Sequence, residues 1–372
     1  MEYMFNGKRI FPIVDVATDI IPSLSGIGMK DFHLDKKKCA YAWKTGLEKF
    51  KEYFGDLFSR PDDDTTSAFD LFPMPKPSPA YISYGHLISI GAPVKFPDSG
   101  EPNVSPFAGS IDEAIDILKE RRGKDFSKNE MFQHYLDVWD YLKMSFPGEK
   151  LPFAGFRDEG PITTAVLMRG HDFFTDLYDE GEKCLLFLKL LSDSLIDYAK
   201  LIRRINGQPE IQENGYIADD FASLVSPAMW GEFVVPFWNQ IYEGVCAAGC
   251  GVAEKRFVHV ENLKSPHLKF LKDVKITHYQ ASVSPEITLD DLKENLDPGI
   301  AFDWYLYPFI ITGMTDKQIE DWVDAAVRAG VLNIRTGLSA STHQKNKLDR
   351  IVMFFRAFDK YIVDNSALRL QN

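Results

Sequence analysis

Short apolar runs rich in β-branched and aromatic residues alternate along the chain with longer segments of helical period. Hairpin-spaced strands are missing, so the alternation predicts βα units around a parallel sheet. The predicted strands are Ile10–Val14, Asp56–Ser59, Pro152–Phe156, Glu210–Ile217, Arg256–Val260, Lys275–Tyr279, Ile300–Trp304 and Val331–Arg335. Eight parallel strands close a barrel. We therefore expect an α/β fold, a (β/α)8 TIM barrel, as a single domain over residues 1–372.

Apolar positions at helical spacing fill the gaps between these strands and also predict extra helices in the N-terminal part of the chain. The predicted helices are Lys36–Tyr53, Ile111–Arg121, Asn129–Ser145, Thr163–Leu177, Glu180–Arg204, Pro227–Ala248, Pro266–Leu271, Leu289–Leu296, Asp316–Ala329 and His343–Val363. Ser226 and Thr315 are candidate N-caps. Residues 66–109 are rich in Pro and Gly without a helical period, which predicts a long loop excursion that serves as a lid or a docking surface.

In a parallel barrel the reacting groups project from the C-terminal ends of the strands. Polar residues follow almost every predicted strand: Asp15, Asp19, Asp62, Asp63, Asp64, Arg157, Asp158, Glu159, Asp219, Asp220, His259, Glu261, Asn262, His278, Asp303, Arg335 and Thr336. The acidic run at 62–64 is typical of a solvated surface.

The run Phe257–Asn262 places His259 and Glu261 two residues apart near a strand end, so that both side chains point to one face. His278 ends the neighbouring strand. Two imidazoles and a carboxylate with a fourth position open form a plausible catalytic zinc site. We therefore predict His259, Glu261 and His278 as metal ligands. The alternative is that His259 and Glu261 bond each other or a substrate without metal.

Three carboxylates are candidates for acid–base work at the same end of the barrel: Glu159, Asp219 and Asp303. Glu159 precedes a Gly-Pro turn into a helix. Asp219 has a neighbouring carboxylate in Asp220, which would raise the pKa of one of the two; its structural alternative is an N-cap or a loop ion pair. Asp303 precedes Trp304 and could be a base, a ligand or a buried partner of Arg335.

Composition argues against nucleic acid and membranes as partners and against a disulfide framework. The net charge of −12 repels nucleic acid and anionic lipid, and no cluster of Lys and Arg along the chain is dense enough to offset it. No apolar run reaches the roughly 18 residues of a membrane span, and the first residues do not resemble a signal peptide, so we expect a cytoplasmic protein. Four cysteines are too few for a disulfide framework. A Cys246–Cys250 pair on one helical face is expected to be two buried thiols.

Nucleophile-elbow, P-loop and dinucleotide motifs are missing from the sequence. Three other runs are informative: residues 91–102 (GAPVKFPDSGEP), residues 159–170 (EGPITTAVLMRG) and residues 224–236 (LVSPAMWGEFVVP). Together they resemble the uroporphyrinogen decarboxylase superfamily over nearly the whole chain. The resemblance implies a (β/α)8 barrel with its active site at the strand C-termini.

Two branches of that superfamily compete. Decarboxylases hold the substrate carboxylates with an Arg-rich N-terminal motif, whereas the corresponding residues 12–19 here contain no Arg and two carboxylates, Asp15 and Asp19. The other branch transfers methyl groups to or from corrinoid cobalt, using zinc bound by a His-X-Cys pair and a later Gly-Cys-Gly turn. This chain has His259-Val260-Glu261 and Thr336-Gly337-Leu338 at those places. Oxygen and nitrogen ligands favour an oxygen-bearing substrate over a thiol.

The resemblance therefore implies an enzyme similar to the methyltransferases of O-demethylase systems. The expected activity moves a methyl group from a methoxylated, aromatic small molecule to the cobalt of a partner corrinoid (cobalamin) protein, with zinc as Lewis acid. The 13% aromatic content supplies side chains for a ring-binding pocket. The alternatives are a decarboxylase and a non-catalytic protein that binds a corrinoid or tetrapyrrole. A homodimer is compatible with the sequence.

Overall fold

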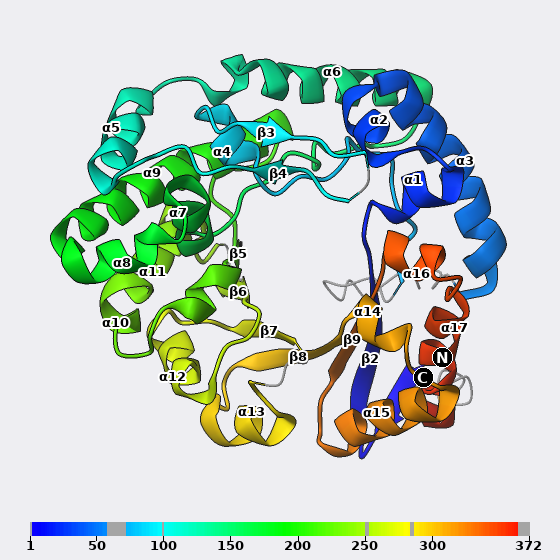
Figure 1. The fold of residues 1–372 in the computed structure, drawn as a ribbon. Helices are drawn as coiled ribbons and strands as arrows, with labels where there is room; N and C mark the ends of the chain where they lie inside the picture. Colours follow the sequence, from blue (N-terminus) through cyan, green and yellow to red (C-terminus); the bar gives the residue numbers. More distant parts are fainter. Residues whose placement is uncertain (1, 58–71, 99, 250–252, 283–285, 364–372) are drawn as a thin grey trace.

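A computed structural model describes residues 2–57, 72–98, 100–249, 253–282 and 286–363. Parallel strands curve around a central axis, with helices outside them, which is the α/β barrel that the alternation predicted (Figure 1). In spatial order these strands are β2 (Lys8–Val16), β9 (Asn333–Leu338), β8 (Ala301–Leu306), β7 (His278–Ser282), β6 (Lys255–His259) and β5 (Asn214–Ala218). Antiparallel β1 (Glu2–Phe5) and β10 (Ile362–Val363) extend the sheet beyond β2.

Two barrel positions are filled by single residues rather than by strands. Ile82 and Phe156 form one parallel bridge, and Ile82 N donates to Gly155 O at 2.7 Å. The predicted strand Pro152–Phe156 is therefore reduced to its last residue. The predicted strand Asp56–Ser59 is wrong where it is described, because Gly55–Leu57 is a 3-10 helix that continues the preceding α-helix. Residues 58 and 59 lie outside the described residues, as do Asp62, Asp63 and Asp64.

The helices of the N-terminal half include four that match predicted helices to within one residue at each end, and three for which no range was predicted, namely the first two and the fourth in chain order. The helices of this half are α1 (Ile20–Ser25), α2 (Met29–Leu34), α3 (Lys36–Phe54), α4 (Gly85–Ser89), α5 (Ile111–Arg121), α6 (Glu130–Ser145), α7 (Pro161–Arg169), α8 (Asp172–Asp179) and α9 (Gly181–Ile205). The predicted helix Thr163–Leu177 is split into α7 and α8, because Gly170 takes a left-handed φ of 84° that breaks the helical hydrogen bonds.

The C-terminal half contains α10 (Trp230–Phe233), α11 (Val235–Val245), α12 (Ser265–Asp273), α13 (Leu289–Asn295), α14 (Pro308–Ile311), α15 (Asp316–Arg328), α16 (Ala340–Gln344) and α17 (Asp349–Arg356). Thr315 caps α15 as predicted, whereas no helix starts at Ser226. Helix α11 ends at Val245, so Cys246 is extended rather than helical, and Cys250 lies outside the described residues. The predicted helix His343–Val363 is broken by Asn346, which has a φ of 54°.

The described part of the Pro-rich segment, residues 72–98 and 100–109, contains only α4 and a short hairpin of β3 (Val94–Lys95) and β4 (Asn103–Val104). Figure 1 shows this hairpin on the side of the barrel where the strand ladder is interrupted. The same segment contains Ile82, whose bridge to Phe156 takes the place of the strand predicted at Asp56–Ser59.

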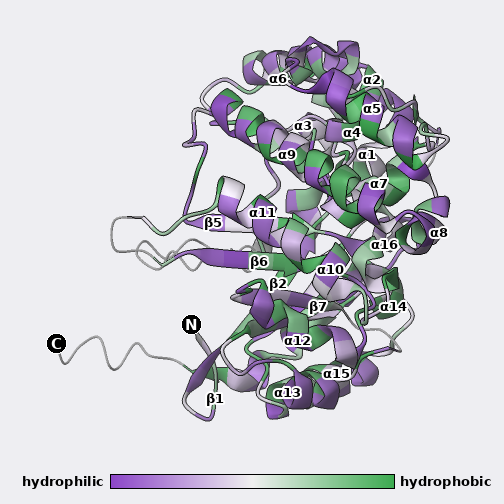
Figure 2. Cartoon of the chain, turned by 90° about the vertical axis from the view of Figure 1, so that its left-hand side faces the viewer, coloured by the Kyte–Doolittle hydropathy of each residue, from purple (hydrophilic) through white to green (hydrophobic). Residues whose placement is uncertain are grey.

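The core lies between the strands and the surrounding helices. Side chains of one parity, such as Ile217, Val258 and Ile334, are buried against the helices. Side chains of the other parity face the barrel interior, where Tyr216 is 56% exposed, so the interior is partly hollow. Figure 2 shows α8, α10, α14 and α16 at the opposite end from β1, which is the end where the parallel strands finish. No helix in the described residues is long and apolar enough to span a membrane.

Candidate active site and metal centre

Three side chains that can ligate a metal gather where β5 and β6 end. Asp220, His259 and Glu261 each offer one ligand atom, and these atoms lie within 4.8 Å of one another. His259 Nε2 is 3.5 Å from Asp220 Oδ1 and 3.9 Å from Glu261 Oε1. His259 and Glu261 were predicted as a pair. The third member is Asp220, not His278.

Local backbone structure brings this trio together. Strand β6 ends at His259, so Glu261 lies in the following turn, which Asn262 closes with a φ of 59°. Asp220 begins the 3-10 helix Asp220–Leu224 after β5. Its Oδ1 accepts a hydrogen bond of 2.9 Å from the Glu261 backbone N–H. This bond holds the Asp220 carboxylate beside His259, although β6 ends one residue earlier than predicted.

The donor set fits a divalent metal. One imidazole nitrogen and two carboxylate oxygens are ligands that zinc accepts, and three protein ligands leave a position for substrate. Asp220 and Glu261 are partly exposed, and neither carboxylate has an ion pair with Lys or Arg in the described ranges. His259 Nδ1 is buried and has no hydrogen-bond partner in the described part of the chain.

His278 belongs to a second cluster, deeper in the barrel. His278 Nε2 is 2.7 Å from Asp303 Oδ1, and Arg335 Nε is 2.9 Å from Asp303 Oδ2. Arg335 Nη1 also donates to both oxygens of Asp15, at 2.6 and 2.8 Å. Asp303 is only 2% exposed. Of the roles considered for Asp303, the contacts match the buried partner of Arg335.

Both carboxylate oxygens of Asp219 accept hydrogen bonds from neighbouring protein groups. It is fully buried and accepts hydrogen bonds from the backbone of Ile162 and Thr163, in the first turn of α7, and from Trp238 Nε1 at 2.7 Å. Burial raises its pKa to about 6, against the effect of these donors. The arrangement corresponds to the capping alternative rather than to acid–base work, with the difference that Asp219 caps a helix from another βα unit.

Glu159 lies next to Gly160, just before α7, and lines a cavity of about 320 Å³ together with Tyr81, Tyr216 and Phe257. Burial, supported by the nearby negative charges of Asp220 and Asp219, raises the pKa of its carboxyl to about 8. A group with this pKa holds a proton at neutral pH. Glu159 is therefore the predicted catalytic residue whose surroundings best suit a general acid.

The barrel interior contains a second, connected cavity of about 620 Å³. It shares Tyr81, Asn214, Tyr216 and Phe257 with the cavity beside Glu159. Its remaining lining residues are polar or small: Asp15, Val258, His278, Gln280, Asp303 and Arg335. The combined space has the size and the mixture of aromatic and polar walls of a small-molecule site.

Sequence reasoning missed two parts of this site. Tyr216 shares its strand parity with Asn214 and Ala218, so period-two alternation could have identified it as facing the interior. Tyr81 lies in the irregular segment and has no such pattern. At the place of the Gly-Cys-Gly turn, Gly337 packs so closely against Tyr305 Oη and Pro308 that an added Cβ would collide with both. A cysteine ligand at position 337 is therefore sterically excluded unless Tyr305 and Pro308 move.

Comparisons with known proteins give a fold and a family. A methyltransferase from Methanosarcina mazei superimposes with a TM-score of 0.65 at 15% identity, covering 95% of this chain and 94% of that one. A putative vitamin-B12-independent methionine synthase from Listeria monocytogenes gives a TM-score of 0.45 at 10% identity, covering 98% of this chain and 100% of that one. No curated protein sequence matches the chain. The family model described as uroporphyrinogen decarboxylase (URO-D) matches residues 84–361. The chain therefore belongs to the URO-D family.

Proposed function

We propose that this protein is a methyltransferase that takes a methyl group from a methoxylated aromatic molecule and passes it to the cobalt of a separate corrinoid protein. The observation on which the proposal depends is the Asp220–His259–Glu261 trio. Two further facts support it: the chain is a URO-D family member, and a solved structure of the same fold is named a methyltransferase.

The trio would hold zinc through His259 Nε2 and one oxygen from each carboxylate. Zinc supplies, when bound, a Lewis acid for the ether oxygen of the donor. Asp220 replaces His278 in this ligand set, because His278 Nε2 is hydrogen-bonded to Asp303. The hydrogen bond from the Glu261 backbone already orients the Asp220 carboxylate, which lowers the entropic cost of ordering the site.

The chain's own residues would bind the donor and manage its proton. Tyr81, Tyr216 and Phe257 form a wall against which an aromatic ring can pack. Glu159, protonated at neutral pH, would donate its proton to the phenolate oxygen that remains after the methyl group leaves. Asp303 and Asp219 are engaged by neighbouring groups and would act by holding the site in shape.

Decarboxylation of a porphyrinogen is disfavoured by the same cavity. A polycarboxylate needs cationic partners, and in the cavity of about 620 Å³ the cation, Arg335, is already engaged by Asp15 and Asp303; the adjoining cavity adds Arg157 and Arg203. Asp15 and Asp303 add negative charge to the larger cavity that repels a carboxylate substrate.

The test is methyl transfer in a reconstituted system. The purified protein, loaded with zinc, is mixed with a reduced corrinoid protein and with methoxyphenols, and formation of methylcobalt is followed by absorbance. Glu261→Gln should lower the rate at least about a hundredfold, because a ligand is lost at the reacting centre. Asp290→Asn, which changes an exposed carboxylate at the start of α13, is the matched control. Absence of methylcobalt with every donor would refute the proposal.

A further inference from the structure

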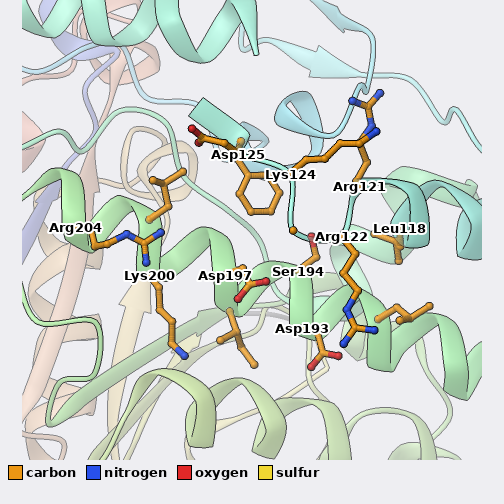
Figure 3. A pocket seen from close by; sticks show the side chains of 15 residues that line it. Leu118, Arg121, Arg122, Lys124, Asp125, Asp193, Ser194, Asp197, Lys200 and Arg204 are labelled. Atoms are coloured by element: carbon orange, nitrogen blue, oxygen red, sulfur yellow. The ribbon is translucent and has the colours of Figure 1, made fainter. Parts of the chain in front are cut away.

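A polar pocket of about 580 Å³ lies on the outer side of the barrel, between α5 and α9 (Figure 3). The segment 122–126, which follows α5, closes one side of it. A smaller pocket of about 370 Å³ adjoins it and shares Arg121, Lys124, Asp125 and Phe126. Figure 1 places α5 and α9 outside the ring of strands. The pocket is therefore separate from the cavity inside the barrel.

The lining of the two pockets is rich in cations. Six basic side chains, from α5, from the following segment and from α9, line the two pockets: Arg121, Arg122, Lys124, Lys128, Lys200 and Arg204. Three carboxylates accompany them, Asp125, Asp193 and Asp197. The whole chain has a net charge of −12. Folding brings these cations together from two segments far apart in sequence, so no run of Lys and Arg along the chain indicates the pocket.

Several of the cations are not used by the protein itself. Lys124 and Arg204 pair with Glu120 and Glu210, at 3.0 and 2.6 Å. In contrast, the charged groups of Arg121, Arg122 and Lys200 have no ion pair or hydrogen bond within the described ranges.

The carboxylates offset this charge only in part. Asp125 caps the 3-10 helix Phe126–Lys128, and Asp193 accepts a hydrogen bond from Gln240 at 2.7 Å. These hydrogen bonds occupy one oxygen of each carboxylate and leave its negative charge in place. The six cations still outnumber the three carboxylates, so the lining keeps a net positive charge.

We propose that this pocket binds a small polyanion that contains two or more linked phosphate groups. Guanidinium groups match the geometry of phosphate oxygens, and charge-assisted bonds of this kind are strong. The volume is in the range of small-molecule sites. Leu118, Ile196 and Phe126 add an apolar floor against which an uncharged part of the ligand can pack.

The experiment measures binding of inorganic triphosphate, ATP and inorganic phosphate to the full chain by titration calorimetry. Triphosphate should bind at least tenfold more tightly than phosphate, since several cations engage one ligand, and its affinity should fall as salt rises. The double variant Arg121→Gln/Arg122→Gln should lose at least tenfold in triphosphate affinity, and Lys200→Gln should show a similar loss.

Matched controls come from the same two helices. Lys119→Gln on α5 and Lys189→Gln on α9 remove the same charge outside the pocket lining and should bind triphosphate as the unmodified protein does. Melting temperatures check that every variant is folded. No binding of triphosphate, equal losses in pocket and control variants, or tighter binding of a polyglutamate peptide than of triphosphate would overturn the proposal. None of these outcomes depends on methyl transfer.

Discussion

Two polar clusters lie on the parallel strands of this barrel and on the turns that follow them, and they differ in how far their charges are satisfied by the protein. The deeper cluster, His278–Asp303–Arg335–Asp15, is joined by contacts of 2.6 to 2.9 Å. The outer trio, Asp220–His259–Glu261, is spaced at 3.5 and 3.9 Å around its imidazole. A buried charge must be paired, whereas groups that are close but not bonded leave room for a ligand.

The sheet register relates the two clusters. His259 pairs with Gln280 on β7, and Gln280 pairs with Asp303 on β8, so the three residues lie in one row across neighbouring strands. Strands are about 4.8 Å apart, which puts the backbones of His259 and Asp303 about 10 Å from each other along the sheet. The deeper cluster can therefore support the wall of the cavity without providing ligands to a metal bound by the trio.

The largest expected loss of stability comes from a change in the deeper cluster. Asp303→Ala leaves Arg335 and His278 buried without their shared acceptor, so the free energy of unfolding should fall by about 3–5 kcal/mol. Urea denaturation of the metal-free protein measures it. A loss under about 1 kcal/mol would show that the cluster contributes little to stability.

A somewhat smaller effect is expected at Asp219. Asp219→Asn turns an amide N–H toward one of three donors that now face a carboxylate, so the unfolding free energy should fall by about 2 kcal/mol. Trp238→Phe in the same background removes one of those donors and should recover part of the loss. If the double variant is as unstable as the sum of the two single changes, Asp219 and Trp238 are not coupled as described.

Glu159 should make stability depend on pH. The folded chain, with a carboxyl pKa of about 8, keeps a proton that the unfolded chain releases near pH 4.3. Stability is therefore lost as pH rises from about 4.3 to about 8. Glu159→Gln cannot ionise, so relative to the unmodified protein it should gain up to about 4 kcal/mol between pH 5 and pH 8.5. Urea denaturation at both pH values measures this difference. If Glu159→Gln and the unmodified protein differ in unfolding free energy by the same amount at pH 5 and at pH 8.5, the raised pKa is contradicted.

The smallest change in stability is expected at Asp220. Its side chain is partly exposed and accepts one hydrogen bond, from the Glu261 backbone, which an amide oxygen can also accept. Asp220→Asn should therefore change the unfolding free energy of the metal-free protein by less than about 1 kcal/mol. A loss as large as that of Asp303→Ala would mean that the trio is structural, like the deeper cluster.

Periodicity along the chain predicted much of the barrel and part of its site. β-branched runs identified β2, β5, β6, β7, β8 and β9, because each is a buried parallel strand. The pair His259 and Glu261 followed from one local pattern. Asp220 and Asp219 could not be told apart, since only the turn after β5 decides which one is buried. Ile82 was missed because a single bridge has no period, and the His278–Asp303–Arg335 contacts join separate strands.

Zinc binding to the purified full chain tests the central claim most directly. The account predicts one zinc per chain by elemental analysis. Affinity, measured by competition with a chelating dye, should fall at least about tenfold in Asp220→Asn and in Glu261→Gln. It should be retained in His278→Gln, whose amide can still donate to Asp303. A protein that binds no zinc, or one that loses it in His278→Gln while Asp220→Asn retains it, would contradict the assignment.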